Sequence, residues 1–186
     1  SEISYSSTWD NNAVGQSHGR GLLDSPQAWS AGANNTNQWM QIALANNKQI
    51  SGITTQGRTD CCSQWVTRYK VSFSQDGKNF TWVDGGAEFV ANYDWNTKVN
   101  NVFSTTVTAK FVRIHPTGWV NHISMRAALI EYDNNIDIKA TKSLNEQASI
   151  VNVSAASKIG IGAPTIDMPA SQINLQSGSV GNASGS

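Results

Sequence analysis

Residues that could carry out acid–base or nucleophilic chemistry are few and scattered in this chain. Its three histidines are His18, His115 and His122, and its two cysteines, Cys61 and Cys62, are neighbours. Catalysis by a nucleophile, a base and an orienting group requires three side chains held within hydrogen-bonding distance of one another. No such triad and no carboxylate pair has support beyond composition. The sequence therefore predicts a protein that is not an enzyme.

The two cysteines cannot hold distant parts of the chain together, because they are adjacent. If they bond to each other, they close a tight and strained ring. The absence of a long-range disulfide is compatible with assembly in a reducing compartment. A metal or redox role lacks partners at ligand spacing. We interpret Cys61 and Cys62 as structural or incidental, with their redox state left open.

Two short polar stretches carry groups that suit a sugar. Trp9 is followed by Asp10 and Asn11, and Arg58 stands two residues before Asp60. The apolar face of a sugar ring can stack on a tryptophan, while neighbouring hydroxyls bind to planar Asp, Asn or Arg groups. Arg58 and Asp60 could flank one ligand or pair with each other, and both alternatives stay open.

The overall charge excludes some partner classes. The chain has 13 Lys and Arg residues and 13 Asp and Glu residues, so its formal net charge is zero. Nucleic acid and anionic membranes attract proteins with a basic surplus. No apolar run approaches the roughly 18 residues that a membrane span needs. We therefore expect neither nucleic acid nor membrane lipid as the main partner.

Composition divides the chain into two regions. All seven Trp, four Tyr and five Phe residues lie between Tyr5 and Tyr132, and no aromatic residue, Arg, His or Cys follows Asp133. Packed cores use aromatic side chains for their large buried area. We place a domain boundary at 132–135, with a globular domain over 1–133, a repetitive segment over 134–178 and a flexible Gly/Ser-rich end over 179–186.

The first region is predicted to be all-β. Tyr69, Val71 and Phe73 alternate with polar residues, which is typical of a strand with one buried face. The Asp76–Gly77 pair predicts a hairpin turn. The runs rich in β-branched and aromatic residues are short, as in a sandwich or barrel, and cover 38–44, 50–57, 65–74, 80–85 and 109–116.

Several side chains are assigned to the structure rather than to a site. Trp29, Trp39, Trp65 and Trp82 alternate with polar residues inside predicted strands, so we expect them in the core. His115 precedes Pro116 at a strand end and is also interpreted as structural.

Several motifs in this region, taken in order, resemble the discoidin domain family, also called the C-type domain of coagulation factors V and VIII. They are "LLDSPQAWSAGANNTNQWMQIAL", "ISGITTQGR", "QWVTRYKVSFSQDGKNFTWV" and "AKFVRIHPTGWVNHISMRAALIEY". The resemblance covers 3–132 and implies an eight-stranded jelly-roll sandwich, usually a binding module. Loops at one end form a mouth for glycans, proteins or phospholipid headgroups. Many members join their first and last strands by a disulfide, and the matching ends of this chain carry no cysteine.

The resemblance also implies which loops form the mouth, namely 7–21, 24–27, 58–63 and 118–122. These loops are polar, and Trp9 is the only large apolar residue near the first tip, so lipid binding is disfavoured. Similarity to slime-mould discoidins over 57–70 and 119–126 implies a galactose-type glycan. The candidate ligand-binding residues are Trp9, Asp10, Asn11, His18, Arg58, Asp60, Trp119 and His122.

A metal site is a further hypothesis. Asp24 holds a position that calcium-binding relatives of this fold use, and Glu131 is a late carboxylate that could join it. Calcium requires six to eight oxygen ligands, and the sequence names only these two carboxylates. No other cofactor is expected.

The second region has a repeat of paired aliphatic residues. The pairs start seven or eight residues apart, and an i, i+2 pair puts two side chains on one face of a short strand. Such a unit supplies about one side of a triangular β-helix, so three chains are needed to bury it. The sequence therefore predicts a homotrimer. The pairs are Ile136/Ile138, Val151/Val153, Ile159/Ile161, Ile166/Met168 and Ile173/Leu175, with Leu144 alone between the first two.

This pattern resembles the triple-stranded β-helix of phage tail spikes and contractile injection spikes over about 40 residues. That resemblance implies an intertwined trimeric β-helical stem at 136–176. The alternatives are a disordered stalk rich in Ser, Ala and Asn, or extra strands packed on the sandwich.

The sequence thus supports three functional hypotheses. The first is a trimeric, galactose-type glycan-binding module for adhesion, on the surface of a virion or another extracellular particle. The second is a structural virion or spike component whose discoidin-like domain docks another protein. The third is an extracellular, secreted lectin with a disordered tail, which the Asn-X-Ser/Thr sequons would permit.

Overall fold

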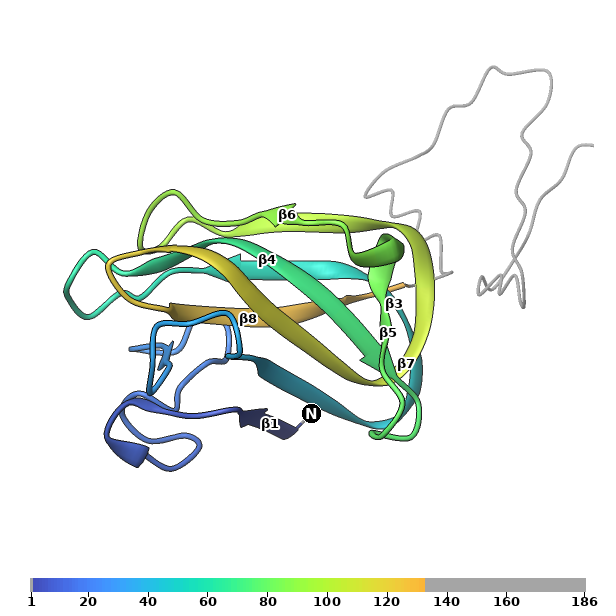
Figure 1. Ribbon diagram of the computed structural model, residues 1–186, viewed down its shortest axis with the longest axis horizontal. Coiled ribbons are helices and arrows are strands. Elements are labelled where there is room, and N and C mark those ends of the chain that lie inside the picture. Colours follow the sequence, from blue (N-terminus) through green and yellow to red (C-terminus); the bar gives the residue numbers. More distant parts are fainter. Residues whose placement is uncertain (1, 133–186) are drawn as a thin grey trace, which may run out of the picture. The chain divides into compact units, whose positions relative to one another are not determined.

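The computed structural model describes residues 2–132, which form eight β-strands and two short 3-10 helices, η1 and η2 (Figure 1). The prediction of an all-β, eight-stranded sandwich is confirmed. The predicted stem over 134–178 and the end over 179–186 lie outside the described residues. The elements are β1 (Glu2–Tyr5), η1 (Trp9–Asn11), β2 (Trp29–Ser30), β3 (Met40–Gln56), β4 (Trp65–Ser74), β5 (Thr81–Trp82), η2 (Val83–Gly86), β6 (Phe89–Val90), β7 (Val99–Val120) and β8 (Ser124–Glu131).

The strands pair antiparallel in the order β2-β8-β3-β7-β4-β5, with β1 added to β3 and β6 added to β4. The long strands β3 and β7 connect the two layers of the sandwich. Residues 40–43 of β3 pair with β1 and with residues 111–114 of β7. The later part of β3 pairs with β8 and with the beginning of β7. One continuous strand therefore contributes to both layers.

The change of layer occurs at irregularities in β3. Its register with β7 shifts between Ala43 and Lys48 and again between Ile50 and Gly52. Irregularities of this kind bend a strand and increase its twist. Gly52 is required there, because a Cβ atom at this position would lie 2.2 Å from the carbonyl oxygen of Asn101.

The core lies between the layers and follows the predicted alternation. Tyr69 and Val71 of β4 are fully buried, whereas Arg68 is exposed. They pack with aliphatic residues of β3, β7 and β8, which include Ile50, Ile53, Val112, Ile114 and Met125. The predicted turn at Asp76–Gly77 is also confirmed. It connects β4 to β5, and the carboxylate of Asp76 accepts the backbone N–H groups of Lys78 and Asn79, each at 2.8 Å.

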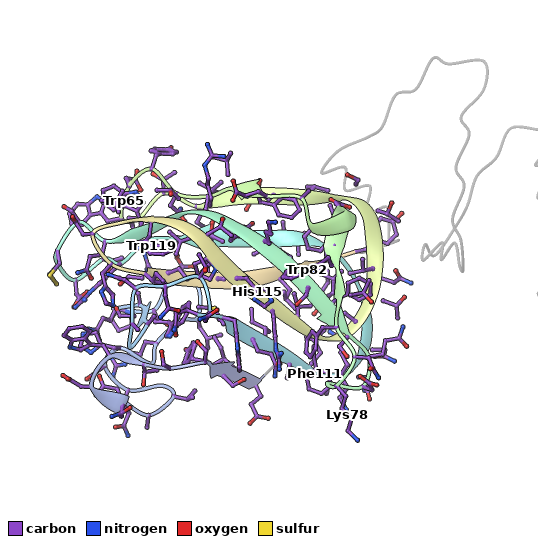
Figure 2. The ribbon with its side chains drawn as sticks, in the orientation of Figure 1. Trp65, Lys78, Trp82, Phe111, His115 and Trp119 are labelled. Atoms are coloured by element: carbon purple, nitrogen blue, oxygen red, sulfur yellow. A yellow bond between two sulfur atoms is a disulfide. The ribbon has the colours of Figure 1, made fainter. Side chains whose placement is uncertain are left out.

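Four tryptophans were expected in the core, and the structure buries them to different extents. Trp29 is fully buried, and Trp39 and Trp65 are half-buried. Trp82 is 47% exposed. It lies on the two-residue edge strand β5, and its ring contacts the ring of His115 edge-on, with centroids 4.9 Å apart, on the outside of the sheet (Figure 2).

His115, which lies beside Trp82, is held in its neutral form. Its Nε2 shares a hydrogen bond of 2.9 Å with the Oγ of Ser72. Burial, with a smaller contribution from the Arg113 charge, lowers the pKa of His115 from 6.5 to about 4. The interpretation of His115 as structural agrees with these contacts.

The pKa of His115 predicts acid sensitivity. Below pH 6.5 the unfolded chain binds a proton that the folded chain takes up only near pH 4, so stability should fall as the pH drops through this window. We expect a loss of about 2 kcal/mol between pH 7 and pH 4.5 that His115→Gln removes. Urea unfolding of the unchanged protein and of His115→Gln at the two pH values measures it. An unchanged pH profile in His115→Gln would contradict the assignment.

Candidate functional site

Loops from four parts of the chain meet at one end of the sandwich, to the left in Figure 1. They are 6–28, 57–64, 91–98 and 121–123. Hydrogen bonds join them directly. Thr59 donates its hydroxyl to the carbonyl of Pro26 at 3.2 Å, and the side-chain amide of Asn121 donates to the carbonyl of Ser63 at 3.0 Å. The loop clustering implied by the family resemblance is therefore present.

A single buried guanidinium connects three of these loops. Arg126 on β8 is only 2% exposed. It donates to the carbonyl oxygens of Gly57 (2.8 Å), Ser25 (3.0 Å) and Trp95 (3.2 Å). A fourth hydrogen bond of 3.2 Å reaches the Oδ1 of Asn96. Arg126 thus fixes the positions of the three loops without contacting the solvent.

Strained backbone is concentrated in the same region. Of the eight non-glycine residues with positive φ among residues 2–132, all but Asp84 lie in these loops. Conformations of this kind cost free energy and persist where the surrounding structure enforces them, which is common at functional sites. The other seven are Asp10, Asn11, Ser17, Asp24, Cys62, Ser63 and Asn121.

The loops enclose a pocket of about 230 Å³. It brings together side chains that are far apart in the sequence, and its lining residues are Trp9, His18, Ser30, Arg58, Gln64 and His122. Four of the eight predicted ligand-binding residues are in this set. A larger hollow of about 540 Å³ lies on another side of Trp9 and is lined in part by Asp10 and Asn11.

Arg58 is the main hydrogen-bond donor of the pocket. Its Nε and Nη2 bind the two carboxylate oxygens of Asp60 at 2.6 and 3.0 Å, and its Nη1 donates to the Oε1 of Gln64 at 3.0 Å. A guanidinium has five N–H groups, so two remain for a ligand. The hydrogen bonds from Arg58, with a smaller contribution from its charge, hold the pKa of Asp60 below its usual value. Of the two alternatives for this pair, the structure selects pairing, and Asp60 acts by orienting Arg58.

The histidines supply acceptors. The Nδ1 of His18 lies 2.8 Å from Asn12 Oδ1, and the Nε2 of His122 lies 2.8 Å from the carbonyl of Ala31. Both partners are oxygens that only accept, so these nitrogens carry the protons, and in the neutral tautomer of a histidine the second ring nitrogen is an acceptor. Burial and the Arg58 charge lower the pKa of His18, which keeps it neutral at pH 7.

Trp9 provides the aromatic surface at the rim. It is 45% exposed, and its ring contacts His122 edge-on with centroids 5.2 Å apart. Trp119, which is one of the candidate ligand-binding residues, does not line this pocket. It belongs to β7 rather than to a loop and packs against the core as a half-buried residue, near the labelled Trp65 in Figure 2.

Two residues of the pocket, Ser30 and Gln64, are not among the candidates that the sequence indicates. Ser30 lies in the two-residue strand β2, and Gln64 lies one residue beyond the predicted loop. Both belong to the network behind Arg58. The Oγ of Ser124 is 2.8 Å from the Oγ of Ser30 and donates to Gln64 Oε1 at 3.2 Å. A serine and a glutamine have no distinctive spacing, so only the adjacency of Gln64 to the Arg58 loop could have indicated it.

The predicted calcium ligands do not come together. Asp24 is ion-paired with Lys98 at 2.6 Å and Glu131 with Lys48 at 2.8 Å. Asp24 is held beside Gln56, at one end of the β3–β8 pairing, and Glu131 lies at the other end, roughly 15–20 Å away at 3.3 Å per residue. Within residues 2–132, no three His, Cys, Asp or Glu side chains are grouped to hold a metal ion. These two residues therefore do not fit a shared calcium site.

Cys61 and Cys62 form a disulfide with each other. They lie at the tip of the loop that carries Arg58 and Asp60, and the ring leaves Cys62 at φ 78° and Ser63 at φ 41°. The base of this loop is closed by a backbone hydrogen bond of 3.1 Å from Arg58 to Gln64. The disulfide therefore constrains the loop that supplies the main donor.

Comparison with known proteins assigns the domain. A model of the F5/8 type C domain family matches residues 2–129. The chain belongs to this family. Its F5/8 type C domain is 37% identical to lactadherin of Bos taurus over 136 residues, which is 68% of this chain and 32% of lactadherin. The chain thus spans about a third of that relative's length.

Two solved structures share the fold. Discoidin II of Dictyostelium discoideum has a TM-score of 0.63 at 29% identity, covering 70% of this chain and 54% of discoidin II. CpGH89CBM32-5 of Clostridium perfringens, in complex with GalNAc-β-1,3-galactose, has a TM-score of 0.51 at 16% identity, covering 68% of this chain and 88% of that chain. In addition, no helix in the described part of the F5/8 type C domain has the length and apolar character for crossing a membrane.

Replacing Arg126 should destabilise the domain. Arg126→Met keeps an unbranched side chain but leaves the carbonyls of three loops without their donor, which we expect to cost about 3 kcal/mol of unfolding free energy. Arg68→Met removes an exposed guanidinium that pairs with Glu88 and should cost less than about 1 kcal/mol. Urea unfolding compares the two variants. Equal losses would show that Arg126 does not organise the loops.

Reducing the Cys61–Cys62 disulfide should loosen only its own loop. A ring of two neighbouring residues constrains little chain entropy, so we expect the unfolding free energy to change by less than about 1 kcal/mol. The amide of Arg58 should exchange faster, because the loop can leave its positive-φ conformation. Hydrogen exchange on the oxidised and the reduced protein tests this. The double variant Cys61→Ser/Cys62→Ser, which cannot form the disulfide, should behave like the reduced protein. Unchanged exchange at Arg58 would contradict it.

Proposed function

We propose that this F5/8 type C domain is a glycan-binding module and that the pocket between Trp9, Arg58 and His122 binds a galactose-type sugar. One observation carries the proposal. Loops from distant parts of the chain converge so that an aromatic face, guanidinium donors and imidazole acceptors border one pocket. That combination matches a sugar ring, which has an apolar face and a rim of hydroxyls that donate and accept.

Each group has a role in this proposal. The exposed ring of Trp9 stacks on the apolar face of the sugar. The two remaining N–H groups of Arg58 donate to neighbouring hydroxyls, and its pairing with Asp60 fixes the orientation of the guanidinium plane. The acceptor nitrogens of His18 and His122 take hydroxyl protons. In this proposal every side chain of the pocket binds the sugar, and none takes part in a chemical step.

The galactose preference is the finer part of the proposal. It rests on the similarity of 57–70 and 119–126 to slime-mould discoidins, and discoidin II shares this fold. The same fold in CpGH89CBM32-5 carries GalNAc-β-1,3-galactose. We further propose an extracellular setting, on a virion or another particle, where the glycan belongs to a cell surface.

Multivalency would strengthen the binding. A shallow sugar pocket binds weakly by itself, and three pockets on one axis gain avidity without new contacts. The homotrimer comes from the repeat over 134–178, outside the described residues, so it stays a prediction from the sequence. The glycan-binding proposal for the domain does not require it.

Glycan-array binding of the full chain, followed by calorimetry with galactose, tests the proposal. Trp9→Ala removes the stacking surface and should weaken galactose binding about tenfold. Arg58→Lys keeps the charge but loses the planar, bidentate geometry and should weaken binding at least as much.

The matched control is Trp82→Ala, because Trp82 is 47% exposed, close to the 45% of Trp9, but lies on the outside of the sheet. It should bind galactose like the unchanged protein. Absence of glycan binding by the unchanged chain, or equal losses in Trp9→Ala and Trp82→Ala, would remove the proposal.

A further inference from the structure

We infer that the loop over 91–98 carries a second aromatic platform, Tyr93 and Trp95, which contacts further sugar units of the glycan held by the Arg58 pocket. The inference rests on the proposed function and specifies the length of the glycan that the domain binds. The partner would be an oligosaccharide that extends across the loop end of the domain, rather than a single terminal sugar.

The two rings are unusually accessible. Tyr93 is 70% exposed and Trp95 is 55% exposed, and one residue, Asp94, separates them along the loop. Large aromatic side chains lose favourable burial when they stay in water, and grouped exposed ones often mark interaction sites. Neither residue belongs to the 230 Å³ pocket, so the site already described does not account for their exposure.

The loop that displays them is built to hold one conformation. The Asp94 carboxylate accepts the backbone N–H groups of Asn96 (2.9 Å) and Thr97 (2.7 Å) and the hydroxyl of Thr97 (2.6 Å). Asn92 donates its side-chain amide to the carbonyl of Thr97 at 2.8 Å. The buried Arg126 also donates a hydrogen bond to the carbonyl of Trp95. Rings on a fixed loop lose little conformational entropy on binding, which is how aromatic residues in rigid binding loops gain affinity.

The loop that carries the platform packs against the loop that carries Arg58, at Gly57. The backbone of Trp95 packs on Gly57 so closely that a Cβ atom there would lie 2.8 Å from the Trp95 Cα. Gly57 immediately precedes Arg58, and Arg126 binds the carbonyls of both Gly57 and Trp95. In Figure 1 the loop between β6 and β7 lies at the same end of the sandwich as the loop between β3 and β4. Since the two loops pack against each other, the loop of Tyr93 and Trp95 is the neighbouring surface onto which a longer glycan would extend.

The charges around the platform favour a neutral ligand. Asp94 is occupied by its own loop, and Lys98 is paired with Asp24 at 2.6 Å. An anionic surface such as a charged membrane attracts unpaired cations. The aromatic rings, the Asn96 side chain and these internally paired charges suit the hydroxyl-rich, uncharged faces of an oligosaccharide.

The test compares galactose with longer glycans that end in it, lacto-N-biose and lacto-N-tetraose, by calorimetry on the full chain. The unchanged protein should bind the tetrasaccharide more tightly than galactose. Trp95→Ala and Tyr93→Ala should each lower the tetrasaccharide affinity about three- to tenfold and leave galactose affinity unchanged. Arg58→Lys, in contrast, should weaken both ligands. Trp82→Ala is the control with comparable exposure and should change neither.

Three results would overturn the inference. In the first, Trp95→Ala and Tyr93→Ala leave tetrasaccharide binding unchanged while Arg58→Lys abolishes it, so the proposed function stands and the platform does not. In the second, Trp95→Ala weakens galactose as much as the tetrasaccharide. In the third, Trp95→Ala instead reduces co-sedimentation with phosphatidylserine vesicles, which would assign the rings to a membrane. Failure of the unchanged chain to bind any of the sugars would remove the proposed function and this inference together.

Discussion

The buried guanidinium of Arg126 is the interaction on which the loop end of this domain depends. Its four hydrogen bonds reach three loops, and every acceptor is a neutral oxygen. Burying a charge is costly unless its donors are satisfied. The loops must therefore keep their carbonyls turned inward, and this requirement fixes where Gly57, and hence Arg58, can lie. The pocket and the platform are consequences of the same constraint.

The sandwich allows the loops to be strained and polar because its core is separate from them. The irregularities in β3 let one strand serve both layers, and the aliphatic core then carries the stability. Seven positive-φ residues and a disulfide between neighbouring cysteines can consequently be accommodated at one end. The candidate binding residues thus gain fixed positions from strained loop backbone, while the strands supply the core.

The sequence predicted what depends on local pattern. The strand over 65–74 and the Asp76–Gly77 turn follow from alternation and turn chemistry, and the structure has both. Trp82 was misplaced because a tryptophan in a two-residue edge strand gives the same local pattern as a core tryptophan. Family resemblance identified the loops of Trp9, His18, Arg58 and His122. It could not show that Trp119 packs inward, that Gln64 enters the pocket, or that Asp24 and Glu131 lie apart. These facts depend on strand register and on contacts between distant segments, which no local spacing records.

The central claim is that the pocket fixed by Arg126 binds the sugar. Backbone and indole NMR of the full chain, titrated with galactose, tests it most directly, because weak binding still shifts the resonances of contacted residues. The account predicts that the largest shifts occur at the Trp9 indole and at the amides of Arg58, Gln64 and His122, with Trp82 and His115 unaffected. Saturable shifts centred on Trp82 and the outside of the sheet, or no shifts at the pocket, would contradict it.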